Sequence, residues 1–191
     1  GSANTRLTKF VTELDKLNDK KSEKPLDLEQ LFANYNNLGL SISVNTGIIK
    51  GGNFISQLST KSFAEVDIRI PPGIKIKDIL ETIDHMVKKH TGISYRIIKC
   101  WEANWTDPES KICRIVRNAA KTIRDIEPNL VVRLPASDVS RWRKIGIPGV
   151  CYGPQPLLAS GVDDYVIEQD LVDCAKVYAL ASLNFLNSYE T

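Results

Sequence analysis

Apolar residues recur at every third or fourth position near the start of the chain, which is the spacing of one helical face. They are Leu7, Phe10, Val11, Leu14 and Leu17, and Asn4 or Thr5 precedes them as a helix cap. The charged stretch NDKKSEKP follows and predicts a solvated linker. We expect a second, short helix over residues 28–35.

Residues 41–70 carry the pattern of two strands joined by a turn. The first strand ends at Gly51 and Gly52, where paired glycines allow a turn with positive φ. In the second strand, SFAEVDIRI, apolar and charged residues alternate strictly, which predicts one face toward a core and one face away from it. Two prolines after Ile70 end this strand, because proline cannot continue a ladder of hydrogen bonds.

A helical pattern and another strand-like stretch complete the first half of the chain. Apolar positions from Ile76 to Val87 predict a helix that closes at Gly92, and ISYRIIKCWE predicts a strand. The order helix, strand, strand, helix, strand predicts two layers with the helices on one face of the sheet. Residues 1–104 are therefore expected to form a ferredoxin-like α+β domain.

The pattern changes near residue 104, where we place a domain boundary. Helices are expected from Pro108 to about Ile126, over DVSRWRKIG, and from Glu168 to about Tyr189. Strands are expected over NLVVRL and IPGVCYG. Alternating strands and helices predict that residues 105–191 form a partial parallel α/β sheet with flanking helices.

Composition narrows the possible partners. Lys and Arg number 25 against 23 Asp and Glu, and this balance disfavours nucleic acid as the main partner. No apolar run reaches the length of about 18 to 20 residues that a membrane span needs. The four cysteines are widely separated and lie in apolar surroundings, so we expect four buried, reduced thiols and a cytoplasmic protein. They are Cys100, Cys113, Cys151 and Cys174.

The residues alone offer no convincing carrier of catalysis. His85 and His90 are the only histidines, and their spacing of five turns them about 140° apart around a helix, away from a shared metal. No nucleophile elbow and no phosphate-binding glycine loop occurs.

Two polar clusters could nevertheless meet a ligand. Glu65, Asp67 and Arg69 share one strand face, which is either a solvated sheet surface or a place where Arg69 binds a carboxylate. Asp138 ends the stretch NLVVRLPASD, at the carboxyl end of an expected strand where α/β sheets bind ligands. The alternative for Asp138 is that it only caps the following helix.

Three stretches in order resemble the family of two-zinc amidohydrolases that includes acetylornithine deacetylase, succinyl-diaminopimelate desuccinylase, aminoacylase and carboxypeptidase G. They are GGNFISQLSTKSFAEVDIR, ASDVSRWRKIGIPGVCYGP and ASGVDDYV, and the resemblance runs from Asn4 to about Leu186. It implies that residues 1–104 are a lid or dimerisation domain and that residues 105–191 are the C-terminal part of a metallopeptidase-type catalytic domain.

The resemblance also assigns roles to single residues. Arg69 resembles the lid arginine that holds the substrate carboxylate, and Ser56 stands where its partner asparagine is usual. Asp138 matches the aspartate of the family's G-T-D-A loop. Ser160 occupies the position of a metal-binding histidine, and a neutral hydroxyl is a poor zinc ligand beside imidazole.

The remaining metal ligands and the general base precede the lid in this family, whereas this chain starts within the lid. The resemblance therefore implies a zinc-dependent peptidase or deacylase of N-acyl amino acids or small peptides that neither binds zinc nor is catalytic as this chain alone. The implied partners are a second copy through the lid, an N-terminal catalytic half and a small carboxylate ligand. Two alternatives stay open: a non-catalytic dimerisation or carboxylate-binding module derived from the family, and an unrelated ferredoxin-like binding module.

Overall fold

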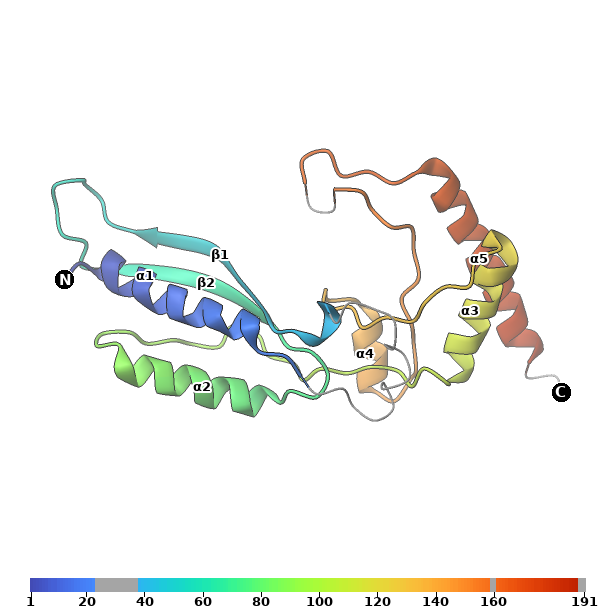
Figure 1. The fold of residues 1–191 in the computed structure, drawn as a ribbon, viewed down its shortest axis with the longest axis horizontal. Coiled ribbons are helices and arrows are strands. Elements are labelled where there is room, and N and C mark those ends of the chain that lie inside the picture. The colour runs from blue at the N-terminus through green and yellow to red at the C-terminus, as the bar shows by residue number, and fades with distance from the viewer. Residues whose placement is uncertain (23–37, 159–160, 189–191) are drawn as a thin grey trace. The chain divides into compact units, whose positions relative to one another are not determined.

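The structure is a computed structural model that describes residues 1–22, 38–158 and 161–188 (Figure 1). The chain divides into two compact units. The first comprises Gly1–Ala103 together with Val132–Pro135, and the second comprises Asn104–Val131 and Ala136–Thr191. Among the described residues, no helix is long and apolar enough to cross a membrane.

The first unit begins with the predicted amphipathic helix α1 (Ala3–Leu14), which continues into the 3₁₀ turn η1 (Asp15–Asp19). Its buried residues Ala3, Leu7, Phe10 and Leu14 confirm the predicted apolar face. The short 3₁₀ turn η3 (Leu38–Leu40) precedes the sheet. The helix expected over residues 28–35 lies outside the described residues.

The sheet of the first unit consists of β1 (Ser43–Gly51) and β2 (Ser62–Arg69), which pair antiparallel. Ser43 lies opposite Arg69 and Gly51 opposite Ser62, with a bulge in β1 between Thr46 and Ile48. The alternation predicted for β2 is confirmed, because its residues switch regularly between partly buried and exposed positions. The sheet therefore has one face on the core and one charged face.

The core of the first unit lies between the helices and the inner face of the sheet. Helix α2 (Ile76–Lys89) contributes Ile79 and Ile83 to it. Full burial of such a side chain stabilises a fold by roughly 1.5–3 kcal/mol. The buried members of the cluster are Phe10, Leu14, Leu17, Ile42, Ile74, Ile79 and Ile83.

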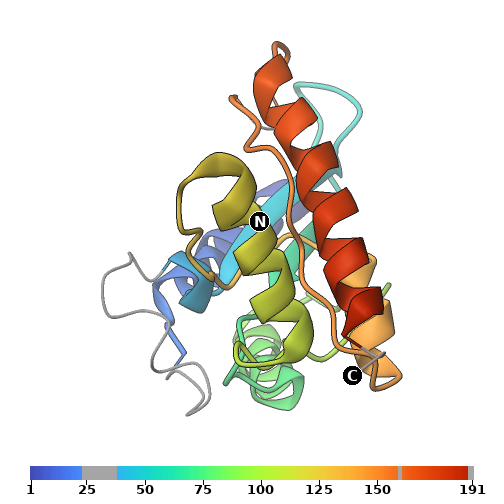
Figure 2. The same cartoon turned by 90° about the vertical axis from the view of Figure 1, so that its right-hand side faces the viewer.

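Three helices form the regular part of the second unit: α3 (Lys111–Arg124), α4 (Val139–Lys144) and α5 (Glu168–Asn187). Figure 2 shows α3 and α5 side by side, and buried Ala119, Ala120, Val177 and Ala181 form their contact. Small side chains at this contact let the two backbones approach closely. Helix α3 ends at Asp125 in a left-handed conformation, close to the predicted end at residue 126.

The prediction of a mixed α/β chain is confirmed, and the structure has a small antiparallel sheet with covering helices. Three expected strands, over residues 93–102, 129–134 and 147–153, are not strands. The only sheet among the described residues is β1–β2, so these apolar stretches have no neighbour with which to form a ladder. The expectation of four buried thiols is wrong for Cys100 and Cys151, which are exposed, whereas Cys113 and Cys174 are buried. None of the four cysteines forms a disulfide.

Candidate functional site

Arg69 is the last residue of β2 and lies on the exposed, charged face of the sheet. Its Nε donates a hydrogen bond to Oδ2 of Asp67 at 2.8 Å, and its side chain is 43% exposed. An ion pair this exposed contributes at most about 1 kcal/mol to stability. What it does is orient the guanidinium, whose two η nitrogens remain to bind a carboxylate in the forked geometry that arginine favours.

Ser56 lies in the loop that follows β1, at the opposite end of the hairpin from Arg69. The strand from Ser62 to Arg69 spans about 24 Å at 3.4 Å per residue. Ser56 and Arg69 therefore do not converge on one ligand within this unit, and the proposed partnership of these two residues has no geometric support in it.

A shallow hollow of about 620 Å³ surrounds Ser56, between the start of α1 and residues 51–59. Asn4 Nδ2 donates to the carbonyl oxygen of Gly51 at 3.3 Å, and the amide of Ala3 donates to the carbonyl oxygen of Ser59 at 2.8 Å. No charged side chain lines this hollow. It offers hydroxyl and amide groups but no cation for an anionic ligand.

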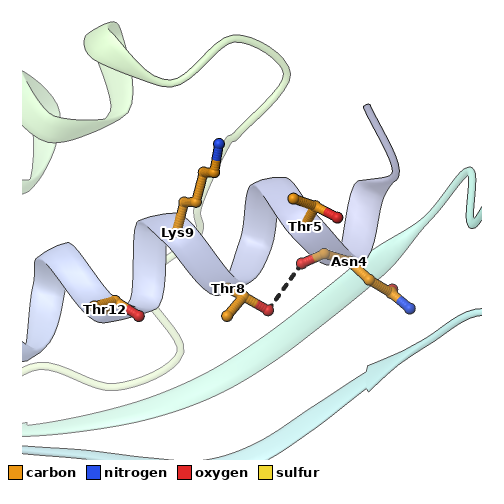
Figure 3. A pocket seen from close by; sticks show the side chains of 5 residues that line it. All are labelled: Asn4, Thr5, Thr8, Lys9 and Thr12. Atoms are coloured by element: carbon orange, nitrogen blue, oxygen red, sulfur yellow. Dashed lines mark hydrogen bonds between the residues drawn. The ribbon is translucent and has the colours of Figure 1, made fainter.

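A second hollow, of about 560 Å³, runs along the exposed side of α1 (Figure 3). It is lined by Asn4, Thr5, Thr8, Lys9 and Thr12. Thr8 Oγ1 donates to the carbonyl oxygen of Asn4 at 3.0 Å, so this hydroxyl is already satisfied by the helix backbone. The hollow is the polar surface of α1, and Lys9 is its only cation.

Asp138 belongs to the second unit and stands at the N-cap position of α4. Its side chain makes no hydrogen bond to the first turn of α4, so Asp138 does not cap this helix through its carboxylate. Instead its Oδ1 lies 3.6 Å from Nε of Arg141, and both side chains are more than four-fifths exposed. Asp138 is therefore an accessible carboxylate beside an exposed arginine, and its role toward a ligand stays a prediction.

A partly buried polar network in the second unit was missed by the sequence analysis. Arg143 donates from Nε to Oδ1 of Asn104 at 2.7 Å and from an η nitrogen to the carbonyl oxygen of Gly149 at 3.1 Å. Thr106 Oγ1 donates to that same carbonyl at 2.6 Å and accepts from the Gly149 amide at 3.0 Å. Asn104 Nδ2 also donates to the carbonyl oxygen of Ser140 at 3.1 Å. The network joins α4 to the segments around residues 104 and 149.

A second cluster holds the end of α3 to the start of α5. Arg124 donates to Oδ1 of Asp170 at 2.5 Å. A hydrogen bond with Tyr152, and then the negative charge of Asp170, raise the pKa of Arg124. Tyr178 donates its hydroxyl to the carbonyl oxygen of Tyr152 at 2.6 Å, and burial raises the pKa of Tyr178. Burial also raises the pKa of Cys174, so this thiol is protonated at neutral pH and does not suit nucleophilic chemistry.

Neither histidine is arranged as a metal ligand. His85 is exposed, and His90 ends α2 with its Nε2 2.5 Å from Oε2 of Glu13. Among the described residues, no three His, Cys, Asp or Glu side chains gather closely enough to hold a metal ion. Ser160, the residue at the family's ligand position, lies outside the described part of the chain. The donor set in the described part therefore does not fit a metal centre.

Comparison with known proteins finds a family match within the first unit. Residues 1–93 match the family model of the peptidase dimerisation domain of M20 peptidases. An M20 family metallo-carboxypeptidase from Sulfolobus solfataricus has a similar fold, with a TM-score of 0.63 and 14% sequence identity. The similarity covers 95% of this chain and 51% of that one, so the chain spans about half the length of the solved structure. No curated protein sequence matches the chain. Residues 1–93 therefore match an M20 dimerisation domain, and the likeness to the solved structure is one of fold.

Proposed function

We propose that this chain provides the dimerisation domain and the following part of the catalytic domain of a zinc-dependent amidohydrolase or peptidase. The observation that carries the proposal is the match of residues 1–93 to the peptidase dimerisation domain. The similar fold of an M20 metallo-carboxypeptidase over most of the chain supports it. The subfamily that the sequence resembles, that of the acetylornithine deacetylases, desuccinylases and aminoacylases, is part of this proposal.

The chain alone is proposed to be non-catalytic. In a metallopeptidase the zinc ions supply an activated water and polarise the scissile carbonyl. The described residues bring together no donor set for such ions, and His90 is already engaged by Glu13. The role left to these residues is assembly of the protein and recognition of the substrate.

The proposed substrates are N-acyl amino acids or small peptides, which carry a free carboxylate. Arg69 is the proposed anchor, because Asp67 fixes its Nε and leaves its η nitrogens for a bidentate contact. Ser56 and Asp138 stay predicted substrate-binding residues, but Ser56 lies at the opposite end of the hairpin from Arg69 and does not share a ligand with it within this unit. An NMR titration with an N-acetyl amino acid tests this role: Arg69→Gln should abolish the shift changes around β2, and the matched exposed variant Arg96→Gln should keep them.

Dimerisation and metal content test the rest of the proposal. Sedimentation equilibrium of the purified chain should give a mass near twice 21.3 kDa at micromolar concentration. Metal analysis should find far less zinc than two ions per chain. A monomer at all concentrations would contradict the proposed dimerisation. Two tightly bound zinc ions per chain would contradict the proposal that the chain alone is non-catalytic.

A non-catalytic module for dimerisation or carboxylate binding is the second candidate, favoured by the lack of a converging donor set among the described residues. The reading frame upstream of Ala3 separates the two candidates. An H-x-D strand followed by paired glutamates there would support an enzyme. In such a longer protein, Ser160→His should raise zinc affinity in a damaged enzyme but produce no turnover in a binding module. A cytoplasmic location remains part of the proposal.

A further inference from the structure

The loop that joins β1 to β2 carries three large apolar side chains, on residues 54–58, which we name the hairpin tip. Phe54, Ile55 and Leu58 are 68%, 100% and 75% exposed, so most of each side chain faces solvent. Single exposed apolar residues are common on protein surfaces. Three of them together on one short loop form a patch, and such patches are typical of interaction sites.

Hydrogen bonds hold this loop in place. The Gln57 amide donates to the carbonyl oxygen of Phe54 at 3.1 Å, which closes a turn at the tip. Ser59 Oγ donates to the carbonyl oxygen of Lys61 at 2.8 Å. The Ala3 amide, at the start of α1, donates to the carbonyl oxygen of Ser59 at 2.8 Å. The loop is therefore tied to α1 and to the start of β2 while its apolar side chains stay exposed.

The segments around the hairpin tip are basic. Residues 1–12 and 41–64 contain no Asp or Glu. Their cationic side chains are all exposed, and none forms an ion pair with a carboxylate of the described residues. These cations are Arg6, Lys9, Lys50 and Lys61. Their positive charge is thus not neutralised within the described part of the chain.

All four cations lie close to the tip. Lys50 is the penultimate residue of β1 and Lys61 directly precedes β2, so these two side chains flank the loop at its base. Arg6 and Lys9 lie on α1 within about 9 Å of Ala3 along the helix axis, at a rise of 1.5 Å per residue. The apolar tip is therefore surrounded by positive charge.

We propose that the hairpin tip is a docking surface for an anionic lipid bilayer. Phe54, Ile55 and Leu58 enter the boundary between headgroups and acyl chains, and the four cations contact headgroup phosphates. Burial of apolar side chains and attraction of Lys and Arg to anionic lipids add at such a boundary. The contact is peripheral, since no described helix is suited to span a membrane. It goes beyond the proposed peptidase function and depends neither on that function nor on the predicted role of Ser56.

The shape of the tip favours a bilayer over a protein partner or a small anion. Figure 1 shows the loop between β1 and β2 projecting beyond both strands. A protein partner would need a pocket to accept such a projection, whereas a bilayer accepts exposed apolar side chains without one. The hollow beside the tip is lined by hydroxyl, amide and apolar groups. It therefore offers no cluster of cations that could enclose a free phosphate.

Co-sedimentation of the purified chain with vesicles tests the surface. Vesicles of phosphatidylcholine and phosphatidylglycerol should bind the chain at least about tenfold more tightly than vesicles of phosphatidylcholine alone. Binding should weaken as NaCl rises from roughly 0.05 M to 0.5 M, because salt screens the cations. The double variant Ile55→Ser with Leu58→Ser should bind about tenfold more weakly or worse. The double variant Lys50→Gln with Lys61→Gln should also lose about tenfold or more.

Matched variants away from the tip are the controls. Lys20 lies at the open end of the hairpin, since the Ile42 amide donates to its carbonyl oxygen, and Lys75 follows the prolines after β2. Lys20→Gln with Lys75→Gln removes two exposed lysines there and should change vesicle binding by less than about twofold. Ile98→Ser removes an apolar side chain that is 62% exposed in another segment and should leave binding unchanged. Circular dichroism confirms that each variant is folded.

Insertion of the tip has a spectroscopic readout of its own. Ile55→Trp adds a fluorophore at the fully exposed position, and its emission is the difference from the wild-type spectrum. With anionic vesicles this emission should shift to shorter wavelength, and lipids with brominated acyl chains should quench it. An unshifted spectrum in the presence of bound vesicles would overturn the insertion of the tip.

Four further results would overturn the surface. They are no vesicle binding at low salt, equal binding to vesicles of phosphatidylcholine alone, undiminished binding by the serine variant, and binding of polyglutamate in place of vesicles. The last would make an acidic protein segment the partner. Sedimentation equilibrium without vesicles measures the dimer separately, so loss of the membrane surface and loss of the proposed dimerisation give different results. Self-association that the serine variant abolishes, without vesicle binding, would make a second copy the occupant of the tip.

Discussion

His90 and Glu13 join the end of α2 to α1, with Nε2 of the imidazole 2.5 Å from Oε2 of the carboxylate. Phe10 meets the same imidazole edge-to-face, with ring centroids 5.6 Å apart. Both side chains of the pair are largely shielded, at 20% and 27% exposure. This contact holds the end of α2 against α1.

The pair makes the stability of the first unit depend on pH. The hydrogen bond with His90, and to a lesser extent its charge, lower the pKa of Glu13 below 4.5. A carboxyl group whose pKa is lower in the folded state stabilises that state above its unfolded pKa, and this contribution disappears as pH falls through the folded pKa. We expect Glu13→Gln to lower the melting temperature at pH 6, and the difference from wild type to shrink toward pH 3.

The control for this prediction is Glu81→Gln on the exposed side of α2. Glu81 lies 3.7 Å from Lys77 with both side chains at least 66% exposed, so its loss should leave the melting temperature nearly unchanged at both pH values. A Glu13→Gln effect that stays equal at pH 6 and pH 3 would show that the charge of Glu13 contributes nothing.

Ile79 is the most deeply buried residue that α2 gives to the core, at 2% exposure. Ile79→Ala should lower the free energy of unfolding by about 2–4 kcal/mol, because it removes apolar contacts and leaves a cavity. Ile55→Ala, at a fully exposed loop position, should change it by less than about 0.5 kcal/mol. Urea unfolding monitored by circular dichroism measures both, and equal effects would contradict the assignment of the core.

Local periodicity predicted those elements whose structure depends on their own residues. The apolar face of α1 and the alternation of β2 were both visible in the sequence, since each element buries one side. The stretches at 93–102 and 147–153 have the composition of strands, yet strand formation requires a neighbour that the described residues do not provide. Sequence pattern reports which face of a segment is apolar, but not whether a partner is present.

For the candidate site, too, the sequence predicted local features but not contacts between distant residues. The charged face that carries Arg69 follows from alternation alone. The network of Arg143 could not be predicted, because Asn104 and Gly149 are 39 and 6 residues away in sequence and the pattern of DVSRWRKIG predicted only a helix. The separation of Ser56 from Arg69 became visible only with the register of β1 against β2.

Arg143 should be important for the stability of the second unit. Arg143→Ala leaves the Asn104 side-chain oxygen without this donor and the Gly149 carbonyl with one donor fewer, which should cost about 1–3 kcal/mol of unfolding free energy. The neighbouring Arg141→Ala removes only an exposed contact to Asp138 and should cost less than about 0.5 kcal/mol. Denaturant titrations that follow Trp142 compare the two, and a larger loss for Arg141→Ala would contradict the network.

Gly51 and Gly47 lie in the same strand but differ in the space beside them. A Cβ at Gly51 would lie 2.1 Å from Oδ1 of Asn4 and 2.5 Å from Cβ of Ser62, whereas one at Gly47 would meet only Nδ2 of Asn45 at 3.6 Å. Gly51→Ala should therefore push α1 and β2 apart and destabilise the first unit by about 1–3 kcal/mol. Gly47→Ala should be tolerated.

Thermal unfolding of the two variants tests this difference, and amide exchange locates its effect. Gly51→Ala should also increase the exchange rate of the Ala3 amide, which donates to the carbonyl of Ser59 next to the same hollow. Adding Asn4→Ala should restore part of the lost stability, because it removes the atom that the new Cβ meets first. If Asn4→Ala leaves the Gly51→Ala defect unchanged, the contact of α1 with β1 is not what requires glycine at this position.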